Sequence, residues 1–247
     1  MKKNSNEIAI SVNDLHVYYR DMNRFSLKKG MKQKGSGKIF KAIKGVTFEI
    51  PKGQILGICG KNGSGKSTLL RAISGIFSPD KGSINLHGNT VSLLSIGVGF
   101  QKQLTGYENI YLSGMLLGYT KDEIDKKVDE IIEFSELGDF VYRPVRSYSS
   151  GMYSKLAFSI TAILETDIIL IDEVLSVGDI HFKEKSYNKM KELISDSNRT
   201  VVIVSHSTNT IVDLCDKVIW LNDGLIKEEG DPAKIMAKYE AFMRDEG

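Results

Sequence analysis

The feature that most constrains this chain is a glycine-rich segment placed between an apolar run and a predicted helix. Residues 60–67 fit the pattern G-x-x-x-x-G-K-[ST], which binds nucleotide phosphates when it follows a strand and opens a helix. Residues 54–59 predict a buried strand and residues 67–76 a helix. This context argues against a chance glycine turn. The expected phosphate-binding residues are Gly60, Lys61, Asn62, Gly63, Ser64, Gly65, Lys66, Ser67 and Thr68.

The residue types of this loop match the chemistry of phosphate binding. Glycines let backbone N–H groups approach phosphate oxygens without a Cβ clash, and the N-terminus of the following helix adds partial positive charge. We expect Lys66 to neutralise the β- and γ-phosphates of ATP and Ser67 to ligate Mg²⁺. The loop by itself does not distinguish among the classes of enzyme that handle phosphates.

A second apolar run ends in two acidic residues. Residues 168–171 are Ile-Ile-Leu-Ile, and Asp172 and Glu173 follow them. At the carboxyl edge of a parallel sheet, Asp172 is expected to hold Mg²⁺ through water and Glu173 to polarise the attacking water. A general base must reach that water at roughly 3 Å, which suits the residue after the metal ligand. Solvated acids at an ordinary strand end are the alternative, but the phosphate loop favours the catalytic interpretation.

Composition limits the remaining classes of protein. The formal net charge of +2 over 247 residues is too small to argue for nucleic acid binding. Cys59 and Cys215 are far apart and lack zinc-ligand spacing, so we expect neither a disulfide framework nor a zinc site. No stretch approaches the ~18 apolar residues of a spanning helix, and the N-terminus has no signal-peptide core. We expect a cytosolic chain whose membrane role comes through a partner.

The layout of the chain predicts one α/β domain over residues 1–247. Strands are expected over residues 8–19, 46–50, 54–59, 83–86, 91–94, 167–171, 200–205 and 217–221, and helices over 107–140, 154–164 and 232–244. A basic insert over residues 20–44 has nine Lys or Arg residues against one acid, Asp21. It is either a solvated hairpin or a surface for anionic head groups.

Residues 148–152, Tyr-Ser-Ser-Gly-Met, are similar to a variant of the signature loop Leu-Ser-Gly-Gly-Gln. Together with the phosphate loop and the carboxylates, they make the chain resemble the ATP-binding subunits of ABC transporters. In that family the signature loop caps the γ-phosphate of ATP held by the opposite subunit, so Ser149 and Gly151 are expected to act in trans. The resemblance implies a P-loop NTPase (RecA-like) core, an antiparallel β subdomain and a helical subdomain at about residues 103–160.

Two further family motifs follow in the expected order. Residues 176–179, Ser-Val-Gly-Asp, stand where the family has its dimer-contacting D-loop, although Gly178 replaces the usual leucine. His206 ends the predicted strand over residues 200–205, where the family has a histidine that senses the γ-phosphate. A lone histidine is more often structural, but this one stands at the expected place, and the resemblance makes it a catalytic residue.

Two other family positions have competing candidates. Gln101 is similar to the Q-loop glutamine, which contacts Mg²⁺ and relays to the membrane subunit, but the spacing is short and Gln103 is a rival. Tyr19 is similar to the aromatic residue that stacks on adenine, with Tyr18 as the alternative. Either tyrosine also suits a strand edge.

A narrower resemblance extends over four segments, namely residues 93–100, 104–110, 148–152 and 172–179. They look like the exporters of polysaccharide and teichoic acid. This implies a homodimeric ATPase with two ATP molecules between its subunits, on the cytoplasmic face of the membrane. It would power export of a lipid-linked glycopolymer through a separate permease. Some members carry a further carbohydrate-binding domain; the chain ends at Gly247, after the ATPase core, so none is expected here.

Three other functions compete with this one. Another ABC transporter would use the same motifs. A soluble ABC ATPase acting on ribosomes or DNA usually has two ATPase domains or a long coiled coil, and the sequence suggests neither. A small-molecule P-loop kinase would not need the signature loop or His206. The motifs therefore favour the exporter.

Overall fold

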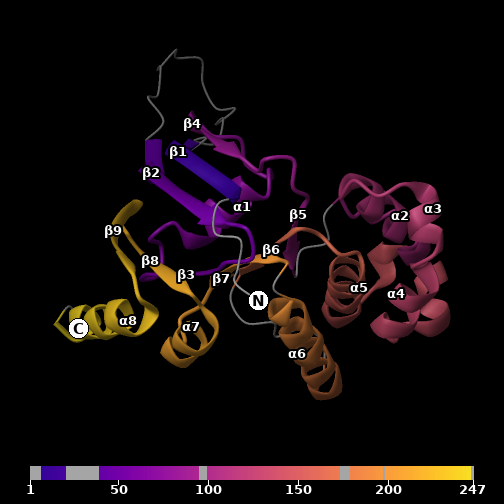
Figure 1. Cartoon of the computed structure of the whole chain (residues 1–247). Coiled ribbons are helices and arrows are strands. Elements are labelled where there is room, and N and C mark those ends of the chain that lie inside the picture. The colour runs from indigo at the N-terminus through magenta and orange to yellow at the C-terminus, as the bar shows by residue number, and fades with distance from the viewer. Residues whose placement is uncertain (1–6, 21–38, 95–98, 173–178, 197, 246–247) are drawn as a thin grey trace, which may run out of the picture.

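The chain folds around two sheets with a group of helices at one side (Figure 1). The structure is a computed structural model that describes residues 7–20, 39–94, 99–172, 179–196 and 198–245. The larger sheet contains β3 (Ile55–Cys59), β5 (Val91–Leu94), β6 (Ile168–Asp172), β7 (Thr200–Val204), β8 (Lys217–Asn222) and β9 (Leu225–Gly230), in the order β5-β6-β7-β3-β8-β9. The smaller sheet contains β1 (Ile8–Arg20), β2 (Ile39–Pro51) and β4 (Lys81–Asn85), in the order β2-β1-β4.

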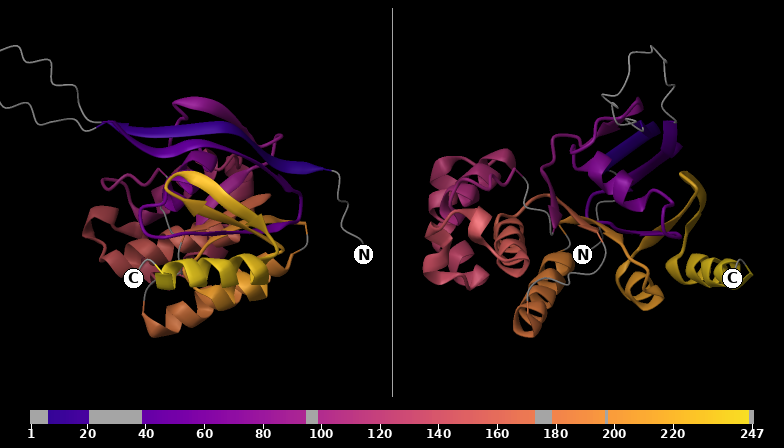
Figure 2. Two further views of the ribbon diagram at one scale, coloured as in Figure 1. Left: turned by 90° about the vertical axis from the view of Figure 1, so that its left-hand side faces the viewer. Right: turned by 180° about the vertical axis from the view of Figure 1, so that it is seen from behind.

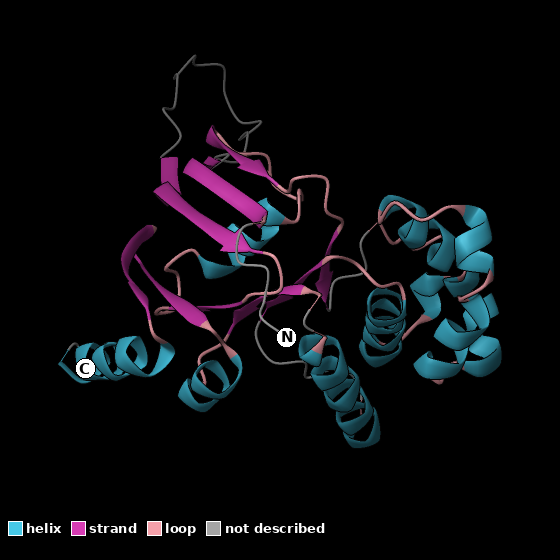
Figure 3. Ribbon diagram, viewed as in Figure 1, coloured by secondary structure: helices cyan, strands magenta, loops and turns pink. Residues whose placement is uncertain are grey.

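The central strands of the larger sheet are parallel and apolar on both faces. Every residue of β7 is buried, as are four of the five residues of β3 and of β6. Near-continuous apolar runs are typical of parallel strands that are covered on both sides. α1 (Lys66–Ile73) lies between the two sheets (Figures 1 and 3), and Leu69, Leu70 and Ile73 join the core formed by both of them.

Other helices cover the opposite face of the larger sheet (Figure 2). They are α6 (Ile180–Ser195), α7 (Thr208–Leu214) and α8 (Pro232–Asp245). Phe182, Leu193 and Ile194 of α6 pack on β6 and β7, and Ile235, Met236 and Tyr239 of α8 pack around Trp220 of β8. The parallel strands are therefore enclosed between two layers, which leaves their carboxyl ends for the site.

The remaining helices form a lateral subdomain with its own core. They are α2 (Gly106–Leu116), α3 (Lys121–Asp125), α4 (Val128–Ser135), the 3-10 turns Gly138–Tyr142 and Val145–Ser147, and α5 (Ser150–Ile163). Thr105 and Thr120 each begin a helix with a capping box, in which the threonine and a glutamate three residues later satisfy each other's backbone N–H. Phe134 and Phe158 connect this subdomain to α6.

Each predicted strand is present. Most of the ends that differ from the prediction do so by one or two residues, but β2 begins at Ile39 rather than at residue 46. The helix expected over residues 107–140 is interrupted and forms α2, α3, α4 and a 3-10 turn. The boundaries predicted for the basic insert are too wide, because Arg20 belongs to β1 and residues 39–44 belong to β2. The rest of the insert, residues 21–38, lies outside the described residues.

In the part of the chain that is described, no helix combines the length and apolar character needed to cross a membrane.

Candidate functional site

The phosphate loop lies between the end of β3 and the start of α1, as the sequence predicts. Asn62 and Gly63 form its exposed tip, Lys61 is half-buried and Ser64 is buried. Gly65 has φ +105°, and a Cβ at this position would lie 2.6 Å from the carbonyl oxygen of Ala42. Only glycine fits here, because the left-handed backbone and the close contact both exclude a side chain.

The two polar side chains that open α1 face the carboxyl edge of the sheet. Lys66 is 6 % exposed, and its Nζ donates to the carbonyl oxygens of Gly60 at 2.7 Å and Lys61 at 3.0 Å. Its ammonium group is therefore held inside the curve of the loop. Ser67 Oγ donates to Asp172 Oδ1 at 3.1 Å, although 105 residues separate the two in sequence. The structure thus brings the predicted metal ligands Ser67 and Asp172 together.

Strand register places the other candidates at the same edge. Asp172 pairs with Val204, and Val204 pairs with Ile58 on the next strand. The carboxyl ends of these three strands therefore lie side by side, because the strands are parallel. His206 follows β7 at this edge and is exposed. Glu173 and residues 176–178 lie outside the described residues.

Tyr19 and Tyr18 lie in different surroundings on β1. The hydroxyl oxygen of Tyr19 is 3.0 Å from Thr68 Oγ1, and its ring packs edge-on against Phe77 at 5.9 Å. The Tyr18 hydroxyl oxygen is 3.0 Å from His16 Nδ1. Tyr19 is the tyrosine that borders the phosphate loop, and 40 % of its surface is exposed.

The signature segment begins α5 on the helical side. Ser149 is the N-cap residue, and its Oγ accepts a hydrogen bond from the backbone N–H of Met152 at 3.2 Å. Ser149 lines two open hollows, of about 680 and 410 Å³. Neither has a residue of the phosphate loop in its wall, as far as the described residues go. Ser149 is therefore exposed on the helical side, beside hollows that the phosphate loop does not line.

Asp179, the last residue of the D-loop segment, is fixed by an ionic cluster that the sequence did not reveal. Its carboxylate caps α6 by accepting the N–H of Phe182 at 3.0 Å, and Lys155 Nζ of α5 lies 2.8 Å from it. Lys155 also contacts Glu136 at 3.2 Å. The hydrogen bond from Lys155, followed by the one from Phe182, lowers the pKa of Asp179 to about 2. Asp179 thus stays ionised at neutral pH and links α6 to α5.

The turn between β8 and β9 is hydrogen-bonded to the phosphate loop. The backbone N–H of Gly224 donates to the carbonyl oxygen of Ser64 at 3.0 Å, and Lys44 N–H donates to Gly224 O at 2.9 Å. Gly224 therefore connects the phosphate loop to β2.

Replacing Gly224 with alanine should destabilise the protein and weaken nucleotide binding. Gly224 has φ +79°, and a Cβ would lie 2.6 Å from the carbonyl oxygen of Ala42. Gly88 is a matched control, because its φ is also +79° but a Cβ there would have no atom within 4 Å. We expect Gly88→Ala to cost ~1 kcal/mol from the left-handed backbone, and Gly224→Ala roughly 1–3 kcal/mol more from crowding. Urea unfolding and ATP titration of both variants measure this, and equal losses would contradict the support role.

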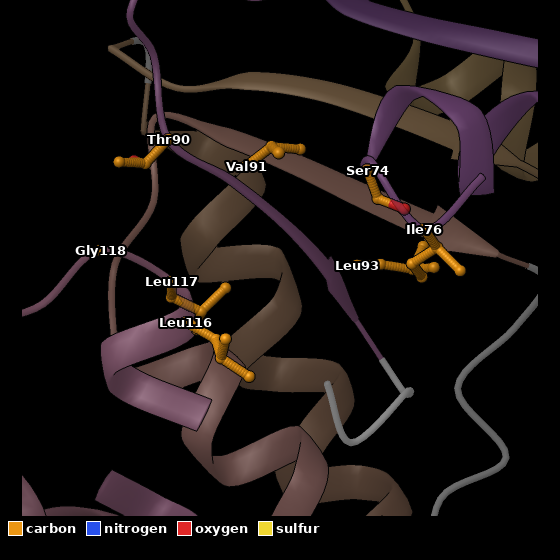
Figure 4. A pocket seen from close by; sticks show the side chains of 8 residues that line it. All are labelled: Ser74, Ile76, Thr90, Val91, Leu93, Leu116, Leu117 and Gly118. Atoms are coloured by element: carbon orange, nitrogen blue, oxygen red, sulfur yellow. The ribbon is translucent and has the colours of Figure 1, made fainter. Parts of the chain in front are cut away.

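A shallow apolar hollow of about 260 Å³ opens where the end of α1, β5 and the end of α2 meet (Figure 4). Its wall is formed by Ser74, Ile76, Thr90, Val91, Leu93, Leu116, Leu117 and Gly118. Ile76 is 43 % exposed and Leu116 58 % exposed. Leu116 also packs against Gly99, so the chain segment that leads into Gln101 borders the same apolar surface.

Comparisons with known proteins agree with this architecture. A family model described as ABC transporter matches residues 43–176, more than half of the chain. The chain is 39 % identical to the O-antigen export system ATP-binding protein RfbB of Klebsiella pneumoniae, covering 96 % of this chain and 92 % of the relative. It is 40 % identical to the teichoic acids export ATP-binding protein TagH of Staphylococcus epidermidis, with 96 % and 90 % covered.

Other relatives are longer than this chain. RfbB of Myxococcus xanthus is 43 % identical over 85 % of this chain, but the match spans only 48 % of that protein. Among solved structures, a bacterial ABC transporter cassette in dimeric form aligns with a TM-score of 0.67 at 23 % identity, covering 90 % of this chain and 98 % of the other. At that identity the match shows the fold, which is that of an ABC cassette. The family model and the nearly full-length relatives show that this chain belongs to the ABC transporter family.

Proposed function

We propose that this chain is the ATP-binding and ATP-hydrolysing subunit of an exporter for a lipid-linked polysaccharide or teichoic acid. The hydrogen bond between Ser67 and Asp172 carries the ATPase part of the proposal, because it joins the phosphate loop to the carboxylate at the strand edge. The similarity to export proteins for O-antigen and teichoic acid supports the class of cargo. A soluble, non-transport ABC ATPase has no comparable support.

The residues at the sheet edge fit Mg²⁺ and a nucleoside triphosphate. Ser67 and Asp172 offer a hydroxyl and a carboxylate oxygen, which suit a hard cation that retains water ligands. Gln101 would add an amide oxygen. When bound, Mg²⁺ neutralises charge on the β- and γ-phosphate oxygens. Lys66 would bind these same oxygens, and Tyr19 would stack on the adenine beside the loop.

The chain's own residues would divide the remaining chemistry between them. Glu173 would accept a proton from the attacking water, and His206 would contact the γ-phosphate from the end of β7. Ser149 and Gly151 would contact the γ-phosphate held by a second copy of the chain. Their separation from the chain's own loop supports this arrangement, because a helix N-terminus with a free approach suits an incoming phosphate. The homodimer therefore forms part of the proposal.

Replacing Ser149 with arginine should leave ATP binding to the monomer intact and abolish hydrolysis by the dimer. A bulky cation on the signature segment would block the composite site that this segment completes on the opposite subunit, rather than the phosphate loop of its own chain. ATP titration and steady-state ATPase measurements test this. Ser195→Arg is the matched control, because Ser195 is an exposed serine at the far end of α6. Loss of ATP binding by isolated Ser149→Arg monomers would refute the assignment in trans.

Mixed dimers sharpen this test. If Ser149→Arg is in one subunit and Lys66→Ala in the other, one composite site keeps both of its working halves. If both changes are in the same subunit, each composite site loses one half. We therefore expect up to half of the normal ATPase activity from the first pairing and almost none from the second. The reverse result would place Ser149 at the phosphate loop of its own chain.

A permease and a membrane location complete the proposal. The hollow of Figure 4, with the exposed Ile76 and Leu116 in its wall, is the surface that we assign to an integral-membrane subunit. Contact between this surface and the membrane subunit would hold the chain at the cytoplasmic face of the membrane. The contact surface would border the chain segment that leads into Gln101. No nucleic acid partner is proposed.

Deletion of the chain in its host tests the exporter function. We expect lipid-linked glycopolymer to accumulate inside the cell and to disappear from the surface, with recovery by the wild-type chain but not by an ATPase-dead variant. Affinity purification in detergent should recover a protein with several membrane spans. Normal surface glycopolymer in the deletion strain would contradict the proposed cargo without affecting the ATPase assignment.

A further inference from the structure

The side chain of Asn109 is fully buried in the first turn of α2 and holds the backbone of Gln101. Its Oδ1 accepts the N–H of Gln101 at 2.7 Å, and its Nδ2 donates to the carbonyl oxygen of Gln101 at 3.0 Å. Nδ2 also donates to Thr105 O at 2.7 Å and, more weakly, to Leu104 O at 3.4 Å. Asn109 is 0 % exposed, so its amide relies on these protein partners.

This pairing specifies asparagine at position 109. The Gln101 peptide presents one donor and one acceptor to the same side chain, and only an amide of this length offers both in return. A buried carboxylate would face the carbonyl oxygens without a donor, and an apolar side chain would leave the Gln101 N–H and these carbonyls unpaired. The orientation of the Asn109 amide is fixed by the same pattern of donors and acceptors.

The residues around Gln101 are attached to the helical subdomain in several other ways. The Phe100 ring packs on Tyr153 of α5 at 4.9 Å. The backbone N–H of Arg146 donates to Lys102 O at 2.8 Å, and Val145 N–H donates to Leu104 O at 2.9 Å. All of these contacts are made with residues of the helical subdomain.

We propose that Asn109 is a positioning residue that makes Gln101 part of the helical subdomain. The placement of the Gln101 side chain at the ATP site is then set by the helical subdomain rather than by the sheet. Any displacement of α2 relative to the sheet moves Gln101 by the same amount. This inference rests on the proposed ATP and Mg²⁺ site.

Hydrogen exchange tests the attachment independently of catalysis. In the wild-type protein, the Gln101 amide should exchange as slowly as the amides in the middle of α2. In Asn109→Ala, its exchange should accelerate ~10-fold or more, because a buried hydrogen bond has been lost. Ser135→Ala is the control: Ser135 is equally buried, on α4, and its hydroxyl donates to Ile132 O at 2.8 Å. Fast exchange at Gln101 in the wild-type protein would refute the attachment even if Asn109→Ala failed to fold.

Metal dependence tests the positioning role. In Asn109→Ala we expect the Mg²⁺ concentration for half-maximal ATPase activity to rise ~10-fold or more, because loss of a residue that positions a metal ligand typically weakens metal binding by that factor. ATP affinity without Mg²⁺ should stay unchanged, because the phosphate loop is not altered. An unchanged Mg²⁺ dependence, or an equal loss of metal-free ATP affinity, would overturn the proposal. If the wild-type chain hydrolysed no ATP, the proposed function would fail, while the exchange result would still decide the attachment.

Discussion

Replacement of Lys66 with alanine is expected to weaken the binding of Mg·ATP by about 10²–10³-fold, since removing one partner of a buried charge pair costs 2–5 kcal/mol or more. In the structure the ammonium group is held within the loop by the carbonyl oxygens of Gly60 and Lys61. It is therefore already placed where the β- and γ-phosphates of a bound nucleotide would meet the loop amides. Alanine removes this positive charge and leaves the backbone of the loop in place.

Isothermal titration with ATP and Mg²⁺ measures the Lys66 effect directly. Lys52→Ala is a suitable control, because Lys52 pairs with Glu7 at 2.9 Å on the surface and is 43 % exposed. The control should bind ATP normally, and circular dichroism of both variants should show native secondary structure. Unchanged affinity in Lys66→Ala would mean that the loop does not bind phosphate as argued.

The sequence predicted the parallel strands of the larger sheet and the phosphate loop, but not the edge strand β9, because the former depend on local patterns. The apolar strands β3, β6 and β7 and the glycine-rich loop can be recognised from a few consecutive residues. The start of β2 was missed because lysines mask it: in Ile39-Phe40-Lys41-Ala42-Ile43-Lys44 only Ala42 and Ile43 are buried. A strand on the smaller sheet with one solvated edge tolerates such a pattern.

The supporting residues of the site were not predicted, for a different reason. Asn109 holds Gln101, 8 residues away, Lys155 contacts Asp179, 24 residues away, and Gly224 is bonded to Ser64 and Lys44, 160 and 180 residues away in sequence. Nothing in their immediate neighbours identifies these partners. A polar residue at an inward position of a helix, such as Asn109 next to Ile110, is the one signal that the sequence offers.

Replacement of Glu173 with glutamine should reduce the rate of ATP hydrolysis by ~10²–10⁴-fold, because a carboxylate that takes up a proton is replaced by a neutral amide of the same shape. Glu173 itself lies outside the described residues, so the argument starts from Asp172. Asp172 is the last residue of β6, and its Oδ1 accepts a hydrogen bond from Ser67 Oγ at 3.1 Å. Glu173 is therefore the first residue beyond the proposed metal ligand. Binding of ATP should persist, since Lys66, Ser67 and Asp172 are unchanged.

The Glu173→Gln variant should therefore accumulate as a dimer with ATP bound between its subunits. Steady-state ATPase assays and light scattering with and without ATP measure the two parts of this expectation. Glu165→Gln is the matched control, because Glu165 precedes the same strand at its opposite end, where it pairs with Arg199 at 2.6 Å. Its turnover should remain normal. Near-normal turnover in Glu173→Gln would remove Glu173 from the role of general base, and a monomer in the presence of ATP would contradict the expectation that unhydrolysed ATP holds the two subunits together.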